Sequence, residues 1–174
     1  RAAAPTPPGT RKANPAGLDF YDRLVDGLLA AQIEPFVTLH HWDLPQALYA
    51  KGGWAIRENL AYFADFAALM VKRLGDRVRS WATLNEPRDI ADAGYASGEH
   101  APGVKNDWRT VQQVIHNLLV AHGLAVQAMR AVNPALELGI VLDVWGVDPA
   151  SDDPADKAAA DLIWNSGRIA YLDR

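Results

Sequence analysis

Two stretches decide the fold: PFVTLHHWD at residues 35–43 and SWATLNEP at residues 80–87. Each begins with a short, almost wholly apolar run and then turns abruptly polar. A run of this kind suits a strand that is buried on both faces, as in a parallel sheet. A third run, LGIVL at residues 138–142, is followed by Asp143 in the same way. The three runs therefore predict three buried strands, each ending in polar or aromatic side chains.

Amphipathic segments separate these runs. Apolar residues recur at three- and four-residue spacing, which predicts helices over about residues 17–32, 58–74, 108–132 and from about Pro154 onward. Gly75 stands where a helix C-cap is expected, and a glycine-rich loop is expected over residues 94–103. Helices of this length between strands are typical of crossover connections, which place the strands parallel. The fold class predicted is therefore α/β.

The chain shows no internal repeat and no composition shift that would mark a domain boundary. We therefore expect one domain over residues 1–174. Residues 1–16 contain four prolines, which predicts a loop or a frayed arm rather than a regular element.

The composition is that of a globular domain and excludes several classes of protein. The 174 residues include 17 Lys and Arg against 21 Asp and Glu, a formal net charge of −4, and 49% are hydrophobic. This mild acidic balance argues against nucleic acid as a partner. Cysteine is absent, which excludes disulfides and thiolate metal sites. No apolar run reaches the roughly 18 residues that cross a bilayer. No signal peptide is visible, so a cytoplasmic location is expected, although the chain begins with Arg rather than Met.

The polar residues after the strands are the candidate functional residues, because function collects at the carboxyl ends of parallel strands. His41, Trp42 and Asp43 follow the first strand, and Asn85 and Glu86 follow the second. An indole among hydrogen-bonding side chains suits a sugar, which presents hydroxyls at its edge and C–H bonds on its faces. Glu86 is the best candidate for proton transfer. The alternative is that Glu86 is a carboxylate at a helix N-terminus, stabilised by the helix dipole.

Taken together, these residues resemble glycoside hydrolase family 1, the retaining β-glucosidase family. The resemblance covers about residues 14–155 and rests on three motifs: His41-Trp42-Asp43, Asn85-Glu86-Pro87 and His100-Ala101-Pro102-Gly103. It implies a partial (β/α)8 barrel whose three strands match strands three to five of eight.

The resemblance also implies roles for individual residues. Glu86 is the general acid and base, Asn85 binds the sugar 2-hydroxyl, and His41 and Trp42 bind other hydroxyls. The substrate implied is a small β-glycoside, with no cofactor. Because neighbouring strand residues point to opposite faces, Asn85 and Glu86 both face one cleft only if the strand ends or bulges there.

One required part is missing. A retaining glycosidase needs a second carboxyl group as nucleophile, which this family takes from a Glu-Asn-Gly motif, and the chain has none. A whole barrel also needs about 250 residues. We therefore expect an incomplete catalytic domain, inactive as an isolated chain. Asp143 as a substitute nucleophile is not favoured, and Arg88 replaces a residue that is usually aromatic or apolar. Two alternatives stay open: a non-catalytic sugar-binding protein and a plain structural α/β module.

The remaining histidines and tryptophans carry structural expectations. His40 is expected to pack or to bond the backbone, His122 to be a satisfied core histidine, and His100 to order its loop. No metal site is expected, because the histidine spacings do not suit one. Trp81 is expected in the core, and Trp54 either lines the cleft or packs under a loop. Packing roles are expected for Trp108, Trp145 and Trp164.

Overall fold

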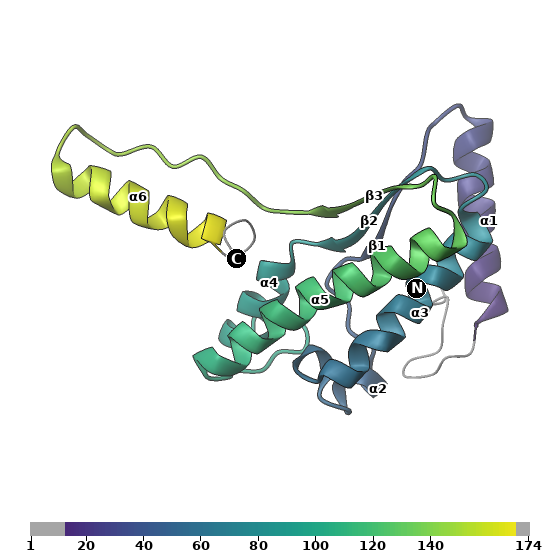
Figure 1. The fold of residues 1–174 in the computed structure, drawn as a ribbon, viewed down its shortest axis with the longest axis horizontal. Coiled ribbons are helices and arrows are strands. Elements are labelled where there is room, and N and C mark those ends of the chain that lie inside the picture. The colour runs from purple at the N-terminus through teal and green to yellow at the C-terminus, as the bar shows by residue number, and fades with distance from the viewer. Residues whose placement is uncertain (1–12, 170–174) are drawn as a thin grey trace. The chain divides into compact units, whose positions relative to one another are not determined.

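The computed structural model describes residues 13–169 and leaves the expected arm, residues 1–12, outside the described part. The described chain forms two compact units, divided between Val141 and Leu142. The first unit holds a three-stranded sheet with its crossover helices (Figure 1). Its main elements are α1 (Pro15–Ala30), β1 (Phe36–His40), α2 (Gln46–Tyr49), α3 (Leu60–Leu74), β2 (Ser80–Asn85), α4 (Pro87–Ala91), α5 (Trp108–Val132) and β3 (Glu137–Val141).

The sheet has the order β1-β2-β3, and both pairs of strands are parallel. Phe36 lies beside Ser80 at one end of the first pair, and His40 lies beside Leu84 at the other. The register between β2 and β3 shifts between Ala82 and Asn85, near the carboxyl end of β2. The α/β class and the parallel arrangement expected from the apolar runs are thus confirmed. Parallel strands bring all three carboxyl ends to one edge, where the polar residues follow.

Helices α3 and α5 lie side by side and cover the sheet (Figure 1). Their apolar stripes meet the sheet in one core, because each stripe is hidden from water only when it faces another apolar surface. The residues less than 2% exposed on α3, the sheet and α5 include Leu60, Leu74, Trp81, Leu84, Leu118 and Met129. Leu84 lies directly before the polar pair Asn85-Glu86, so the end of β2 is anchored by its own last apolar residue.

The bounds of the expected helices and strands agree with the structure within about three residues, and α5 has the predicted bounds, whereas the short helix α2 was not expected. The expected loop over residues 94–103 is partly wrong, because Asp92–Ser97 forms a π-helical turn, η3, that continues α4. The helix expected from residue 58 begins with a short 3-10 turn, and α3 proper starts at Leu60. Gly75 does cap α3, but with φ −73° it uses right-handed backbone that any residue adopts.

The second unit spans Leu142–Arg174 and contains α6 (Pro154–Ile169), the helix expected from Pro154. Its start is held by local polar contacts. The Asp153 carboxylate accepts a hydrogen bond from the Ala155 amide at 2.7 Å, and Lys157 pairs with Asp152 at 2.8 Å. Acidic side chains at a helix N-terminus are favourable because they face its positive dipole end.

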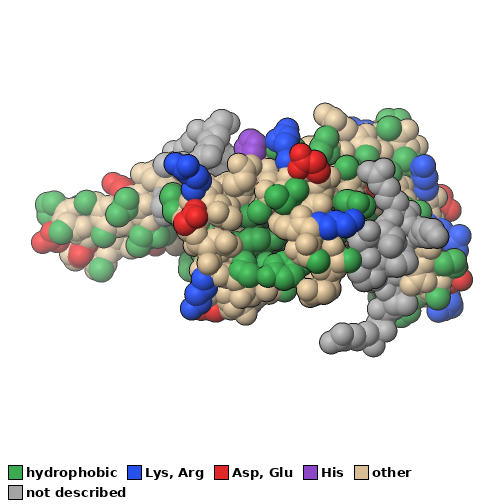
Figure 2. Space-filling view, turned by 90° about the horizontal axis from the view of Figure 1, so that it is seen from below, with side chains coloured by type: hydrophobic (Ala, Val, Ile, Leu, Met, Phe, Trp, Pro, Cys, Tyr) green, Lys and Arg blue, Asp and Glu red, His purple; other side chains and the backbone are tan. Residues whose placement is uncertain are grey.

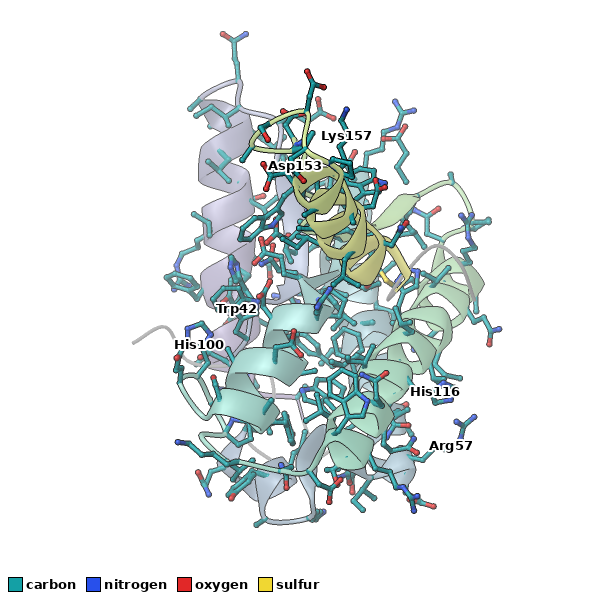
Figure 3. All side chains as sticks on the ribbon, turned by 90° about the vertical axis from the view of Figure 1, so that its left-hand side faces the viewer. Trp42, Arg57, His100, His116, Asp153 and Lys157 are labelled. Atoms are coloured by element: carbon teal, nitrogen blue, oxygen red, sulfur yellow. The ribbon has the colours of Figure 1, made fainter. Side chains whose placement is uncertain are left out.

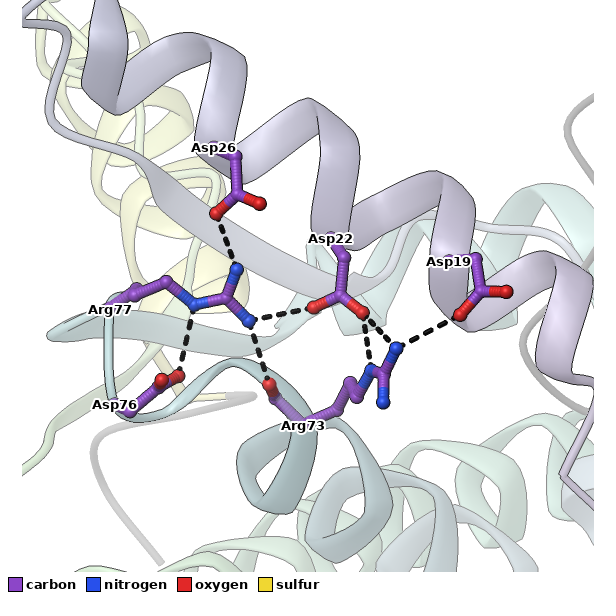
Figure 4. Close-up of polar contacts among 6 residues, drawn as sticks. All are labelled: Asp19, Asp22, Asp26, Arg73, Asp76 and Arg77. Atoms are coloured by element: carbon purple, nitrogen blue, oxygen red, sulfur yellow. Dashed lines mark hydrogen bonds and ion pairs between the residues drawn. The ribbon is translucent and has the colours of Figure 1, made fainter.

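An ion-pair network joins α1 to the end of α3 (Figure 4). Asp22 lies at its centre and accepts hydrogen bonds from both arginines, at 2.7 Å from Arg77 and also from Arg73. Burial raises the pKa of Asp22, but the hydrogen bonds from Arg77 and then Arg73 outweigh it and hold that pKa below its ordinary value of 3.8. The outer members are Asp19, Asp26 and Asp76.

An Asp22→Asn variant is expected to lower the free energy of unfolding by about 1 kcal/mol at pH 7, a typical value for ion pairs near the surface. Because the folded-state pKa is lowered, this stabilisation is present above pH 4 and is lost as the pH falls through the lowered pKa. Urea unfolding at pH 7 and pH 3 measures the difference, with Glu34→Gln as the control, an exposed carboxylate between α1 and β1. A difference that is equally large at pH 3 contradicts the assignment.

On the face drawn in Figure 2, Lys, Arg, Asp and Glu side chains are interspersed, so the described residues there form no patch of a single sign. Within residues 13–169 no helix is both long and apolar enough to cross a membrane.

Candidate functional site

The candidate site lies where β1 and β2 end. Strand β1 ends at His40, so His41, Trp42 and Asp43 follow it directly, and β2 ends at Asn85, followed by Glu86. The two strands are neighbours in the sheet and run in the same direction. The backbone therefore places these residues at the same edge of the sheet, as expected from the sequence.

Glu86 leaves the strand through an unusual backbone conformation. Its φ of 47° and ψ of 66° lie in the left-handed region, which costs a residue with a side chain about 1–3 kcal/mol. Three hydrogen bonds hold it there. Its N–H donates to the Val141 carbonyl at 2.9 Å, and its own carbonyl accepts from the amides of Asp89 at 3.0 Å and Ile90 at 3.2 Å.

This turn resolves the question raised by strand alternation. Asn85 is the last strand residue, and Glu86 is the N-cap of α4, with Pro87 at its first position. Because the chain turns between them, the two side chains are not bound by the alternation of a continuing strand. Both residues are half-buried, while Pro87 is buried. Glu86 therefore lies at a helix N-terminus, as the structural alternative expects. It also lies outside the strand, which is the condition for Asn85 and Glu86 to face one cleft.

Trp42 joins the two strand ends. Its indole N–H donates a hydrogen bond to the backbone carbonyl of Asn85 at 3.1 Å. Its backbone also lies in the left-handed region, with φ 77°, and its amide donates to His40 Nδ1 at 3.0 Å. Trp42 and Asn85, predicted as site residues from 43 positions apart, are thus brought into direct contact.

The other expected site residues are more peripheral. His41 is exposed and places its ring edge-on to Trp42, with centroids 5.6 Å apart. Arg88, on the first turn of α4, pairs with Asp92 at 3.0 Å. Asp143 belongs to the second unit.

His40 has the structural role expected of it. It is 8% exposed and packs against Trp54 and Phe63, and its Nδ1 accepts the Trp42 amide hydrogen. Burial lowers the pKa of His40 to about 4, although the charge of Asp43 opposes this. His40 is therefore neutral at pH 7 and supports the left-handed backbone of Trp42 as a hydrogen-bond acceptor.

The buried neutral state of His40 makes stability depend on pH. Between its ordinary pKa of 6.5 and about 4, the unfolded chain binds a proton that the folded chain does not, so acid lowers the free energy of unfolding. We expect a slope of about 1.4 kcal/mol per pH unit from this group. Urea unfolding at several pH values measures it. The slope is expected to decrease in His40→Phe and to persist in His116→Gln, which changes an exposed histidine of α5. Equal slopes in the wild type and His40→Phe contradict this interpretation.

A cavity of about 910 Å³ reaches the end of β1 but not the end of β2. It is lined by residues of α1, β1 and α3 and by the segment after β1, which contributes His41, Asp43 and Trp54, but not by Trp42, Asn85 or Glu86. Its apolar lining is the surface between the strand and the helices that flank it. Two buried ring nitrogens, His40 Nε2 and Trp54 Nε1, have no hydrogen-bond partner within residues 13–169. The cavity and the strand ends thus share His41 and Asp43 only on the β1 side.

Three buried polar contacts that the sequence reasoning missed support the loop after β1. The Trp54 amide donates to the Tyr95 hydroxyl at 3.0 Å, and the Trp54 carbonyl accepts from Asn117 Nδ2 at 2.8 Å. Asn59 Nδ2 donates to the Gly53 carbonyl at 2.9 Å. Burial raises the pKa of the Tyr95 phenol above its ordinary value of 10. One signal in the sequence could have indicated these contacts. Asn117 lies on the apolar stripe of its helix, and a buried amide side chain needs a hydrogen-bond partner.

The structure decides between the readings of several aromatic residues. Trp54 is 6% exposed and packs under its loop. His122 receives a partner, since its Nδ1 lies 2.7 Å from the Thr83 hydroxyl oxygen. The packing roles expected of Trp108 and Trp145 are wrong, because each is 70% exposed. His100 lies against Trp42, a contact considered below. No group of three His, Asp or Glu side chains within residues 13–169 is arranged to hold a metal ion.

Comparison with known proteins gives a consistent picture. Residues 5–174 match the protein family described as Glycosyl hydrolase family 1. The chain is 46% identical over 167 residues to β-glucosidase A of Acetivibrio thermocellus, covering 96% of this chain and 37% of that protein. It is 42% identical to a 6-phospho-β-galactosidase of Clostridium acetobutylicum, covering 96% of this chain and 35% of that one.

Solved structures agree. The β-glucosidase of Thermotoga maritima in complex with glucoimidazole superimposes with a TM-score of 0.86 at 43% identity, over 91% of this chain and 36% of that chain. The virulence factor SghA of Agrobacterium tumefaciens has also been solved with its substrate analog salicin, and that complex matches with a TM-score of 0.85 at 41% identity over 93% of this chain and 36% of that chain. The chain thus spans little more than a third of the length of the relatives it matches.

Proposed function

The chain belongs to glycosyl hydrolase family 1, and from this premise we propose that it is the acid/base segment of a retaining β-glycosidase that hydrolyses terminal β-linked sugars. The observation that carries the proposal is the junction at the end of β2. There Glu86 leaves the strand in a left-handed backbone conformation, and the Trp42 indole N–H from the neighbouring strand end donates to the Asn85 carbonyl.

Glu86 acts twice in the proposed reaction. In the first step a nucleophilic carboxylate attacks the anomeric carbon, and Glu86 gives its proton to the departing glycosidic oxygen. In the second step Glu86, now a carboxylate, removes a proton from water while that water attacks the same carbon and releases the nucleophile. The half-buried position of Glu86 at a strand end suits both steps, because the group reaches the substrate and is shielded in part from bulk water.

The neighbouring residues are proposed to hold the sugar. The Asn85 side chain binds the 2-hydroxyl, a contact that strengthens in the transition state, and His41 and Trp42 bind further hydroxyls. The Trp42 indole N–H donates to the Asn85 carbonyl, which brings the residues of the two strand ends together. Because the indole has a single donor, Trp42 binds a sugar hydroxyl by exchanging this bond for one to the sugar. His41 is exposed beside Trp42 and thus accessible to a ligand.

The second carboxyl group is proposed to come from outside this sequence. Retaining glycosidases hold their two carboxyl groups about 5–5.5 Å apart, and the chain contains no Glu-Asn-Gly motif. Its match to little more than a third of its relatives supports a nucleophile contributed by the remainder of a family-length protein. A β-glucoside is the favoured substrate class, since structures of relatives are described with glucoimidazole and with the substrate analog salicin.

The 174-residue chain alone is expected to give no turnover of 4-nitrophenyl β-glucoside above the buffer rate, because it holds an acid and base but no nucleophile. Release of 4-nitrophenolate at millimolar substrate measures this, with a family-length β-glucosidase as the positive control. Turnover that disappears in Glu86→Gln would overturn the proposed division of the two carboxyl groups.

The missing motif also favours one alternative, a sugar-binding protein without hydrolysis. The two functions separate when the encoding DNA is read beyond both ends of the chain. A frame that continues to a strand ending in Glu-Asn-Gly supports the glycosidase. A start and a stop codon that bracket these residues favour the binding protein, and binding of glucose or salicin by the chain then becomes the test.

A further inference from the structure

His100 lies face to face with Trp42 (Figure 3). The ring centroids are 4.8 Å apart and the planes meet at 27°, which is a stacked geometry. His100 comes from the loop of residues 98–103, which follows η3, whereas Trp42 follows β1. Stacking between aromatic rings at this distance adds to the energy of simple burial. The contact therefore links a third segment of the chain to the two strand ends.

Trp42 is a residue that needs such support. Its φ of 77° places a bulky residue in the left-handed region, a conformation that persists only where the surroundings fix it. Its amide is held by His40 Nδ1 and its indole N–H by the Asn85 carbonyl. With only one hydrogen bond at Nε1, rotation about the Cα–Cβ and Cβ–Cγ bonds can still carry the indole away from the Asn85 carbonyl. A ring stacked on the indole face removes this freedom.

The loop itself does not depend on the His100 ring. The His100 amide donates to the Ala93 carbonyl at 3.0 Å, the Val104 amide to Gly94 at 3.2 Å and the Asn106 amide to Tyr95 at 2.8 Å. The loop also runs close over Gly94, where a Cβ would lie 2.6 Å from the Ala101 carbonyl oxygen. Because backbone bonds already position the loop, the imidazole is available for the indole.

We propose that His100 is a positioning residue of the site: its ring holds the Trp42 indole in the orientation in which Nε1–H bonds the Asn85 carbonyl, directly before Glu86. The proposal rests on the proposed function for its consequence in catalysis. If Trp42 turns, the carbonyl of Asn85 loses its partner and the Asn85-Glu86 junction loses its link to β1. Small displacements of this kind are costly when reacting groups must meet a substrate in one geometry.

The test observes the indole N–H of Trp42 by ¹H–¹⁵N NMR in the 174-residue chain, with the signal assigned through Trp42→Phe. In His100→Ala and His100→Gln, hydrogen exchange of this N–H is expected to accelerate by roughly three- to tenfold, as the stacking energy predicts. His100→Phe is expected to restore slow exchange, since it keeps a ring. The Trp81 indole, bonded to the Val78 carbonyl in the core, reports whether each variant is folded.

Glu99→Ala is the matched control, because it changes the adjacent loop residue without removing the ring. Unchanged exchange at Trp42 in both ring-less variants overturns the proposal, as does equal acceleration in Glu99→Ala. Failure of His100→Phe to restore slow exchange, with Trp81 still protected, overturns it as well. The readout needs no sugar and no turnover. A response at Trp42 together with no glycosidase activity in a family-length protein that contains this chain refutes the proposed function alone, whereas activity of that protein without the response at Trp42 refutes the positioning role alone.

Discussion

A Glu86→Gln variant of a family-length protein that contains this chain is expected to lose between about 10² and 10⁴ in kcat on alkyl β-glucosides, the range that general acid–base catalysis supplies. The amide has nearly the shape of the carboxyl group but neither donates a proton to the glycosidic oxygen nor accepts one from water. The left-handed junction at residue 86 is held by backbone hydrogen bonds, so the exchange leaves it in place. The loss is therefore one of chemistry and not of folding.

The dependence of the first-step rate on the leaving group shows whether Glu86 acts as a general acid. A 2,4-dinitrophenyl glucoside departs with little need of an acid, so its first step is expected to survive in Glu86→Gln while the second step, which needs a base, remains slow. Pre-steady-state release of dinitrophenolate followed by slow turnover measures this. Glu99→Gln, an exposed residue of the 98–103 loop, is the control and is expected to retain full activity. Equal losses on alkyl and dinitrophenyl glucosides in the first step assign Glu86 a structural role instead.

Trp81→Ala is expected to lower the free energy of unfolding by about 3–5 kcal/mol, the usual cost of truncating a large aromatic residue in a core. Trp81 is 1% exposed in the central strand, and its indole N–H donates to the Val78 carbonyl at 3.0 Å. The truncation leaves a cavity where α3, α5 and the sheet meet, and it also leaves that carbonyl without its donor.

Urea unfolding followed by circular dichroism measures this loss. Trp108→Ala removes the same side chain from a position that is 70% exposed, and it is expected to change stability by less than about 0.5 kcal/mol. A similar cost for both variants contradicts the placement of Trp81 in the core. If Trp81→Ala does not fold, Trp81→Phe, with a smaller cavity, gives a measurable intermediate value.

The site combines two backbone conformations that are costly in isolation. Trp42 and Glu86 both have positive φ, and both follow strand ends that lie side by side. Hydrogen bonds hold both residues: Trp42 bonds His40, two residues before it, and Asn85 of β2, while Glu86 bonds Val141 of β3. Strained residues of this kind gather at functional sites, where the surrounding structure fixes them. The contact from His100 extends the same principle to the loop that follows η3.

Most of the fold was readable from the order of residues. The strands were predicted because each is a short apolar run closed by polar residues or proline, and the helix over residues 108–132 because its stripe repeats without interruption. The spacing of apolar residues is a local property, so it predicts a helix even when the surface against which the helix packs is unknown. The π-helical turn Asp92–Ser97 was not predicted, because its one glycine and its small residues resemble a loop. The hydrogen bond of the Tyr95 hydroxyl with the Trp54 amide, which helps to hold this turn, is visible only in the structure.

The identity of the candidate residues also came from the sequence, since His41, Trp42, Asn85 and Glu86 follow apolar strands and match family motifs. Their mutual geometry did not. The indole bond to the Asn85 carbonyl, the ring of His100 on Trp42 and the buried neutral state of His40 all join segments that are distant along the chain or depend on how tightly those segments pack. A pattern of residues determines which face of an element is apolar. Which side chains then touch, and which lose contact with water, depends on the three-dimensional packing of those faces.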